Sequence, residues 1–162
     1  MQPRTARRAS LREPNEGTEG EVAEFDLKDF LPYLLNQAAE QAGLSFQRIY
    51  KARYGMLRTE WRVLFHLGRY GPMTAKAIGM RTRMHKTKIS RAVSALEARR
   101  FLTRTQLEND RRLERLELTA VGRRAYGDLS ALARTHDTEL MGQFTTEEQA
   151  VLRRCLGRLA GF

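Results

Sequence analysis

The fold is decided by one stretch of the sequence, Met84-His85-Lys86-Thr87-Lys88-Ile89-Ser90-Arg91-Ala92-Val93-Ser94-Ala95-Leu96-Glu97. Ile89, Val93 and Leu96 recur at helical spacing and predict one apolar face. The opposite side carries small hydroxyl side chains and Arg91. Such a helix can pack one face into a core and lay the other in the major groove of DNA, where hydroxyls reach base edges and arginine binds guanine. A solvated helix face without a partner is the alternative that this stretch alone leaves open.

A short β-hairpin is predicted directly after this helix. The runs Leu102–Leu107 and Leu113–Leu118 are short and compatible with β-strands, and Asn109-Asp110 between them is a turn signal. The expected tip, Glu108–Arg112, carries two arginines. A hairpin with arginines at its tip, placed after a helix-turn-helix, is a wing. The predicted fold is therefore mainly α with a small β-hairpin wing.

The order of these motifs resembles the winged helix-turn-helix of MarR-type transcriptional regulators, over about residues 27–160. The chain departs from the family at one position after the recognition helix, where it has Arg100 and the family usually has Gly. A helix end of this kind favours a left-handed residue, so either the helix ends differently or Arg100 tolerates strain. The resemblance rests on Leu57, Trp61, Val63-Leu64, Leu67, Leu96-Glu97, Arg104, Asp110-Arg111-Arg112, Leu118-Thr119 and Gly122.

Composition points to the same class of protein. The chain has 162 residues, of which 41% are hydrophobic, and it carries a net charge of +10. Residues 71–119 hold twelve basic and five acidic residues, so positive charge concentrates on the expected DNA-reading unit. No apolar run approaches the roughly 18 residues that span a bilayer, and no signal peptide is visible. We therefore expect a cytoplasmic protein with no membrane partner.

The pattern divides the chain into three parts. Residues 1–25 are polar and aperiodic and are predicted to form a disordered N-terminal arm, either a plain solvated tail or one whose arginines touch DNA phosphates. Residues 26–56 and 120–162 are predicted to form a helical dimerisation lobe around a winged helix-turn-helix DNA-binding domain at 57–119. By the resemblance, the first and last helices of two chains interleave in a homodimer. An intramolecular three-helix lobe is the alternative.

The predicted mechanism is DNA reading by a two-fold dimer, which places two recognition helices about one DNA turn apart on a pseudo-palindromic operator. Thr74 is expected to cap the first helix of the helix-turn-helix, whose N-terminus can bind a phosphate. Arg112 is expected to enter the minor groove and Arg111 to touch phosphate, while by the resemblance Asp110 pairs with an arginine. The residues predicted to contact double-stranded DNA are Thr74, Lys76, His85, Lys86, Thr87, Lys88, Ser90, Arg91, Asp110, Arg111 and Arg112.

The resemblance also implies a small-molecule effector, often an aromatic acid, between the dimer lobe and the winged domain. The segment Leu31–Gly71 is similar to regulators of aromatic-acid and nicotinate catabolism, so the hypothesis is a repressor that an aromatic carboxylate such as 6-hydroxynicotinate releases from DNA. Ordinary core packing is the alternative for each pocket candidate, although together they would form an apolar box with a few polar groups. The candidates are Tyr33, Tyr54, Arg58, Trp61, Phe65 and His66.

No cofactor, metal site or catalytic group is predicted, and the chain is not expected to be an enzyme. The only cysteine, Cys155, falls on an apolar face of the last helix, where a buried thiol is normally inert packing. His66, His85 and His136 show no metal-ligand spacing, and no phosphate loop or nucleophile elbow occurs. Two rival functions remain: a sequence-indifferent architectural DNA-binding protein, and a winged-helix module that contacts protein or RNA.

Overall fold

The structure is a computed structural model that describes residues 25–107 and 110–161, the side chains of residues 107 and 110–112 excepted. The predicted arm, apart from residue 25, lies outside these ranges. None of the helices in the described ranges is long and apolar enough to cross a membrane. The elements in chain order are η1 (Leu27–Asp29), α1 (Leu31–Tyr54), α2 (Arg58–Tyr70), β1 (Met73–Thr74), α3 (Ala75–Thr82), α4 (Lys86–Ala98), β2 (Leu102–Leu107), β3 (Asp110–Leu118), α5 (Ala120–Met141) and α6 (Thr146–Ala160).

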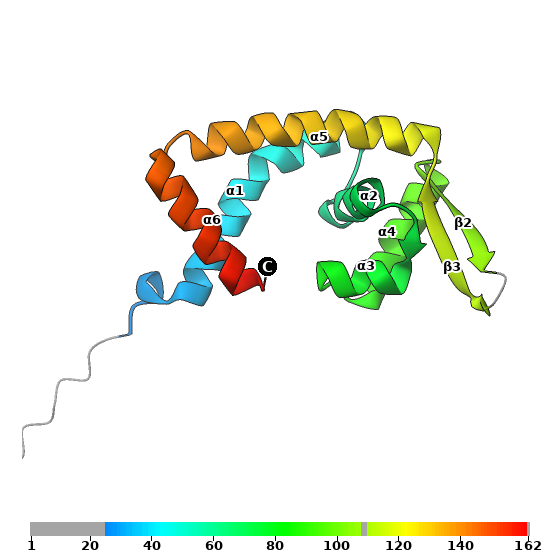
Figure 1. Ribbon diagram of the computed structural model, residues 1–162, viewed down its shortest axis with the longest axis horizontal. Helices are drawn as coiled ribbons and strands as arrows, with labels where there is room; N and C mark the ends of the chain where they lie inside the picture. The colour runs from blue at the N-terminus through cyan, green and yellow to red at the C-terminus, as the bar shows by residue number, and fades with distance from the viewer. Residues whose placement is uncertain (1–24, 108–109, 162) are drawn as a thin grey trace, which may run out of the picture.

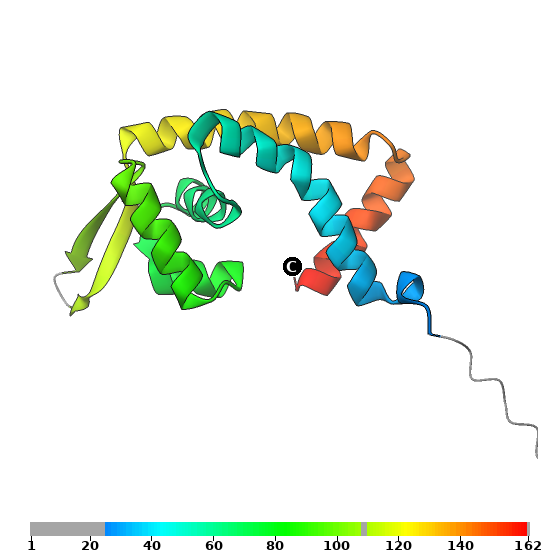
Figure 2. The same cartoon turned by 180° about the vertical axis from the view of Figure 1, so that it is seen from behind.

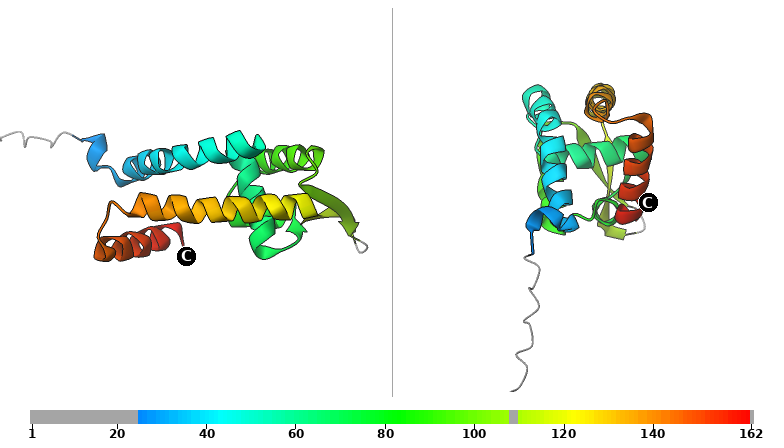
Figure 3. Two further views of the ribbon diagram at one scale, coloured as in Figure 1. Left: turned by 90° about the horizontal axis from the view of Figure 1, so that it is seen from above. Right: turned by 90° about the vertical axis from the view of Figure 1, so that its left-hand side faces the viewer.

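The long helix α5 joins two groups of elements. In Figure 1 it runs along the top of the molecule, with α6 and the start of α1 at one end and α2, α3, α4 and the sheet at the other. Seen from behind, α1 descends from the α5 side toward α6 (Figure 2). Seen from above, α1 and α5 run side by side (Figure 3). The arrangement is mainly helical with a winged helix-turn-helix at one end, which confirms the predicted fold class.

The sheet has three antiparallel strands in the order β1-β3-β2, one more than the predicted hairpin. The short strand β1 was missed because its two residues pair with β3 far along the chain, Met73 opposite Leu116. The predicted tip is also too long, since β3 begins at Asp110 rather than at Leu113. The register shifts after Gln106, and this shift brings Leu107 opposite Asp110.

One buried cluster holds the helix-turn-helix together, and it draws on both ends of the chain. Phe46 and Tyr50 enter it from the second half of α1, and Ala125 and Leu129 enter it from the first half of α5. Burial of this apolar surface, at about 25 cal/mol per Å², is the main stabilising term. The two long helices are therefore fixed to the DNA-reading unit. The largest fully buried side chains of the cluster are Met56, Leu64, Ile78, Ile89, Leu96, Leu102, Leu116, Leu129 and Val63.

The other end of the molecule leaves its apolar side chains uncovered. Among the described residues α6 buries none, although its start has the predicted capping box, with Thr145 and Glu148 each accepting from the other's backbone N–H. Cys155 is exposed, so the expectation of a buried thiol is wrong for the single chain, because α6 turns its side chains outward rather than into a core. The large apolar side chains exposed on η1, the first half of α1 and α6 are Leu27, Leu31, Tyr33, Leu34, Val151, Leu156 and Leu159.

A left-handed residue follows the recognition helix, as is usual for a helix end of this kind. Arg100 has φ of 59°, so the strain is tolerated. Its backbone N–H donates to the carbonyl of Glu97 at 2.8 Å, and its own carbonyl accepts the Thr119 hydroxyl at 2.7 Å. These two hydrogen bonds hold the strained residue in place between α4 and β2.

We expect Arg100→Gly to raise the free energy of unfolding by about 0.5–1 kcal/mol. A left-handed residue with a Cβ is disfavoured by about 1–2 kcal/mol, and glycine returns part of this through its greater freedom in the unfolded chain. Urea denaturation measures the difference. Arg100→Ala is the control, because it removes the same side chain and keeps the Cβ; equal gains for both variants would exclude backbone strain as the cause.

Candidate nucleic-acid interface and effector region

The recognition helix α4 has the two faces that its sequence predicts. One face of α4 is buried, and it consists of Ile89, Ala92, Val93 and Leu96. The predicted DNA-contacting residues on α4 are exposed on the opposite side, so they are free to meet a duplex. They are Lys86, Thr87, Lys88, Ser90 and Arg91.

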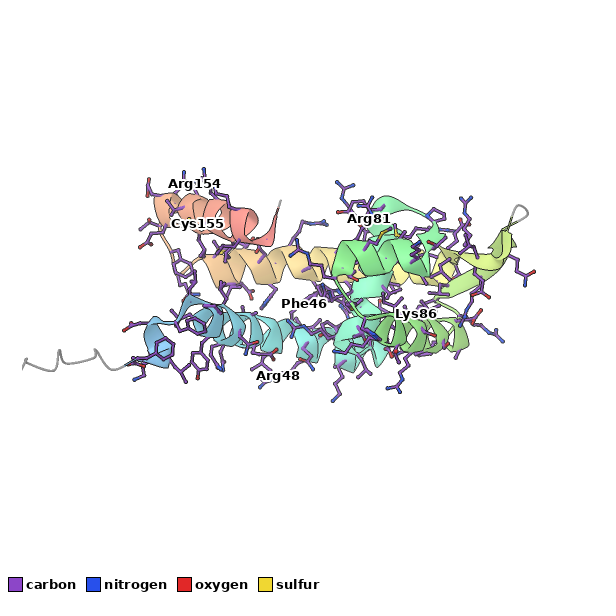
Figure 4. The ribbon with its side chains drawn as sticks, turned by 90° about the horizontal axis from the view of Figure 1, so that it is seen from below. Phe46, Arg48, Arg81, Lys86, Arg154 and Cys155 are labelled. Atoms are coloured by element: carbon purple, nitrogen blue, oxygen red, sulfur yellow. The ribbon has the colours of Figure 1, made fainter. Side chains whose placement is uncertain are left out.

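The two helices of the helix-turn-helix begin with side-chain caps. The Thr74 hydroxyl accepts from the backbone N–H of Ala77 at 3.2 Å, which confirms Thr74 as the cap of α3. His85 caps α4, because its ring Nδ1 accepts from the backbone N–H of Thr87 at 3.3 Å. His85 thus has a structural role next to its predicted phosphate contact. The view from below shows Arg81 on α3 and Lys86 on α4 on this underside of the molecule (Figure 4).

A groove of about 740 Å³ runs between α3, α4 and β3. Its lining includes the apolar side chains of Ile89, Val93 and Leu116. The charged residues that line it are Lys76, Lys86, Arg104 and Glu114, so basic residues outnumber acidic ones. Basic side chains beside a groove can bind the phosphates of a nucleic-acid strand. It brings together four of the predicted DNA-contacting residues, Thr74, Lys76, Lys86 and Ser90.

Arg104 ties the recognition helix to the wing. From β2 it donates to the Ser94 hydroxyl at 2.9 Å and pairs with Glu97 of α4 at 2.8 Å. It also pairs with Glu114 of β3 at 3.3 Å. The sequence motif includes Arg104 but assigns it no role, since its partners become neighbours only when the sheet forms. Asp110, Arg111 and Arg112 are the predicted DNA-contacting residues of the wing, and their side chains lie outside the part of the chain that the structure describes.

The effector candidates on α2 share one side of that helix with a residue that the sequence analysis missed. Arg58 pairs with Glu40 of α1 at 2.9 Å, and one turn later Arg62 donates to the carbonyl of Thr82 at 2.9 Å. Burial lowers the pKa of the Arg62 guanidinium, and the charge of Arg58 lowers it further. The His66 ring lies 2.7 Å from the carbonyl of Arg62. Two like charges so close together would be stabilised by an anion.

The aromatic candidates pack against the core. Trp61 stacks on Tyr50 of α1 with ring centroids 5.6 Å apart, and Phe65 lies 4.9 Å from Trp61 and 5.2 Å from Tyr126 of α5. The indole Nε1 of Trp61 is buried without a hydrogen-bond partner in the described part of the chain. This cluster forms an aromatic wall beside the arginine side of α2. The indole N–H of Trp61 could donate a hydrogen bond to a ligand there.

Tyr54 and Tyr33 lie apart from each other. The Tyr54 hydroxyl donates to Asp128 of α5 at 2.9 Å; burial raises its pKa, and this hydrogen bond adds to the rise. Tyr33 is exposed near the start of α1, about 31 Å from Tyr54 along the helix at 1.5 Å per residue. Within one chain Tyr33 therefore cannot line the same pocket as Tyr54, because a continuous helix separates them.

An exposed polar recognition helix, a basic groove beside it and a β2–β3 hairpin as the wing together define a winged helix-turn-helix DNA-binding protein. The family profile of the MarR family matches residues 54–113, the unit that carries these features. The chain resembles the MarR family transcriptional regulator SPO1453 from Silicibacter pomeroyi DSS-3 at 31% identity and a TM-score of 0.70, over 84% of this chain and 99% of that structure. The chain belongs to the MarR family of transcriptional regulators, which are not enzymes.

Two further similarities agree with this assignment. The HTH-type transcriptional regulator YwoH of Bacillus subtilis (strain 168), itself uncharacterized, is 27% identical over 96 residues, 59% of this chain and 69% of YwoH. BpsR of Bordetella bronchiseptica, whose DNA binding is regulated by 6-hydroxynicotinic acid, has the same fold, with a TM-score of 0.76 at 18% identity over 85% of this chain and 97% of that one.

Proposed function

We propose that this chain is a repressor that binds a pseudo-palindromic operator as a homodimer and leaves it when a small aromatic acid binds. Residues 57–119 would read DNA, and residues 26–56 and 120–162 would form the dimer lobe. The proposal is supported above all by the exposed hydroxyl and arginine side chains of α4 beside a basic groove. An architectural protein would more often present lysines or apolar wedges there.

The test is selection of sheared genomic DNA on the purified protein, followed by sequencing. We expect an inverted repeat whose half-site centres are about ten base pairs apart, because a two-fold dimer presents its recognition helices at that spacing. Recovery of DNA without a shared motif would replace this proposal with the architectural one. Failure to retain duplex DNA at moderate salt would favour a protein- or RNA-binding module.

Two substitutions on the selected operator separate base reading from phosphate binding. Arg91→Ala should lose about 1–3 kcal/mol of binding free energy and relax the preference at one base position. Lys76→Ala should weaken binding to all sequences and reduce the salt slope by about 0.9, since one phosphate contact is lost. Titrations at several salt concentrations measure both quantities. If the two variants behaved alike, the assignment of Arg91 to a base edge would be wrong.

For the effector, we propose an aromatic carboxylate, with 6-hydroxynicotinate as the first compound to examine. The arginine side of α2 carries Arg58 and the half-buried Arg62, and a carboxylate ligand would replace Glu40 as the partner of Arg58. The adjacent Trp61 and Phe65 offer an aromatic wall to the ring. The likeness to BpsR directs the choice of compound; it carries no residue assignment to this chain.

Isothermal titration with a panel of hydroxylated aromatic acids tests this assignment. We expect Arg58→Gln to weaken the binding of the best compound about tenfold or more, because a charge-assisted hydrogen bond contributes about 1.5–3 kcal/mol. Arg69→Gln is the matched control, because Arg69 is an exposed arginine of the same helix. No heat with any acid of the panel would count against an aromatic-acid effector. Equal losses in the two variants would count against Arg58 as the carboxylate ligand.

A further inference from the structure

The C-terminal end of the recognition helix is held by one side chain. Arg99 follows the last residue of α4 as its C-cap, and its Nε donates to the carbonyl of Ala95 in the same helix at 3.1 Å. One terminal nitrogen of its guanidinium donates to the carbonyl of Tyr54 at 2.9 Å and to that of Gly55 at 3.0 Å. These carbonyls belong to the end of α1, so Arg99 joins the ends of two helices that are remote in sequence.

The other terminal nitrogen of Arg99 binds a buried carboxylate. Glu60, which is 6% exposed, pairs with Arg99 and also accepts from the backbone N–H of Leu57 at 2.9 Å. Glu60 lies in the first turn of α2, so its carboxylate also caps that helix. A buried carboxylate is stabilised only when it is paired and hydrogen-bonded, and here Arg99 supplies the charge.

Arg99, Glu60 and the carbonyls of Tyr54 and Gly55 together form a junction between α4, α1 and α2. This junction is also connected to α5, through Tyr54. While the Tyr54 carbonyl accepts from Arg99, the Tyr54 hydroxyl donates to Asp128 of α5. Asp128 also binds Arg53, one residue before Tyr54, at 3.2 Å. The end of α4 is thus linked by hydrogen bonds to α1, α2 and α5. Of these, α1 and α5 are the two helices that extend into the proposed dimer lobe.

The chemistry at this junction requires arginine. Its planar guanidinium presents five donors in a fixed fork, and here they serve three carbonyls and one carboxylate. A lysine would keep the charge next to Glu60 but would have one donor atom instead of three. A change from Arg99 to lysine therefore removes the geometry and retains the charge.

A displacement of these contacts would tilt the recognition helix. A helix of this length is about 20 Å long, so a tilt of about 10° at its fixed end moves the other end by about 3 Å. That distance is as long as a hydrogen bond to a base edge. The N-terminal half of α4 carries the side chains expected to read bases.

We propose that Arg99 is a positioning residue for DNA reading, which holds the recognition helix at a fixed angle to α1 and α5 and thereby fixes the half-site spacing that the dimer accepts. The proposal rests on the proposed function, because it presumes an operator with two half-sites. Arg99 itself touches no DNA in this scheme, so its effect is on geometry rather than on electrostatic attraction.

The experiment measures binding to the operator recovered with the wild-type chain and to duplexes whose half-sites are one base pair closer or farther apart. The variants are Arg99→Lys and the double change Glu60→Gln with Arg99→Gln, which leaves no unpaired buried charge. Arg134→Gln is the control, an exposed arginine of α5. Circular dichroism establishes that each variant is folded at the temperature of the titrations.

We expect Arg99→Lys and the double variant to bind the operator about tenfold more weakly, because a tilted recognition helix would misplace a side chain that reads a base, at a cost of about 1–3 kcal/mol. They should discriminate less between the three spacings, while their salt slope and their affinity for unrelated DNA stay at wild-type values. Arg134→Gln should match the wild type in all these measurements.

Three results would overturn the proposal. A fall in salt slope would make Arg99 a phosphate ligand. Unchanged operator affinity and spacing preference, with only a lower melting temperature, would make its role purely structural. If the wild-type chain itself recovered no inverted repeat, the proposed function would fail and this inference would fail with it, an outcome that is visible before any variant is made.

Discussion

Gly122→Ala should destabilise the fold by about 3 kcal/mol or more, at the upper end for an overpacked core site. A Cβ on Gly122 would lie 2.9 Å from the carbonyl carbon of Phe101, and it would be closer still to the carbonyl oxygen, far inside the sum of the two van der Waals radii. That carbonyl cannot move away freely, because it accepts from the backbone N–H of Thr119 at 3.1 Å. For a domain of this size the melting temperature should fall by roughly 6–12 °C in a calorimetric scan.

Gly127→Ala is the matched control, since it makes the same change in the same helix. A Cβ on Gly127 meets no described atom within 4 Å, so this variant should be as stable as the wild type or more stable by up to about 1 kcal/mol. A shift of less than about 2 °C for Gly122→Ala would show that α5 can move off β3 at little cost. The contact between the helix start and Phe101 would then not be what requires glycine.

Gly122 also illustrates what the sequence could reveal. The motif Leu118-Thr119-x-x-Gly122 resembles that of the family, and this resemblance alone gives no physical reason for the glycine. The structure supplies one: Thr119 caps α5, accepts from the N–H of Gly122 at 3.0 Å and brings the helix start against Phe101. Phe101 lies in the turn between α4 and β2, about twenty residues before Gly122, so no local pattern could identify this contact.

Features that depend on neighbouring residues were predicted well. The amphipathic spacing of α4, the Thr74 cap of α3 and the capping box at Thr145 each involve residues within a few positions of one another. Such interactions follow from helix geometry alone. The DNA-reading face of α4 could therefore be proposed from the sequence.

Features that depend on distant residues were missed or misplaced. Arg99 binds the carbonyls of Tyr54 and Gly55, more than forty residues away, and Arg62 binds the Thr82 carbonyl twenty residues away, so no local pattern in the sequence identifies either arginine. The strand β1 was missed for the same reason. Tyr33 and Tyr54 both lie in the segment whose resemblance to the family implies a pocket, but within one chain the length of α1 separates them.

Leu156→Glu should convert the protein to monomers and reduce operator affinity by about 100-fold or more. The proposed dimer gains avidity because its second half-site is bound as an intramolecular event, a gain of about 10²–10⁴ that a monomer loses. Leu156 lies on α6, which buries no side chain within the single chain, so the free energy of folding of one chain should change little. Apolar side chains gathered on one face are typical of a protein–protein interface.

Val121→Glu is the control for this change, because Val121 and Leu156 are equally exposed in the single chain, at 42% each. Val121 lies in the first turn of α5, where an acidic side chain is favourable, and it is far from α6. It should therefore remain a dimer with wild-type affinity in sedimentation equilibrium and operator titration. If Leu156→Glu stayed dimeric, α6 would not form the interface. If the wild-type chain were itself a monomer, the exposed apolar side chains of α1 and α6 would need another partner, and a single winged domain would have to read its site without the second half.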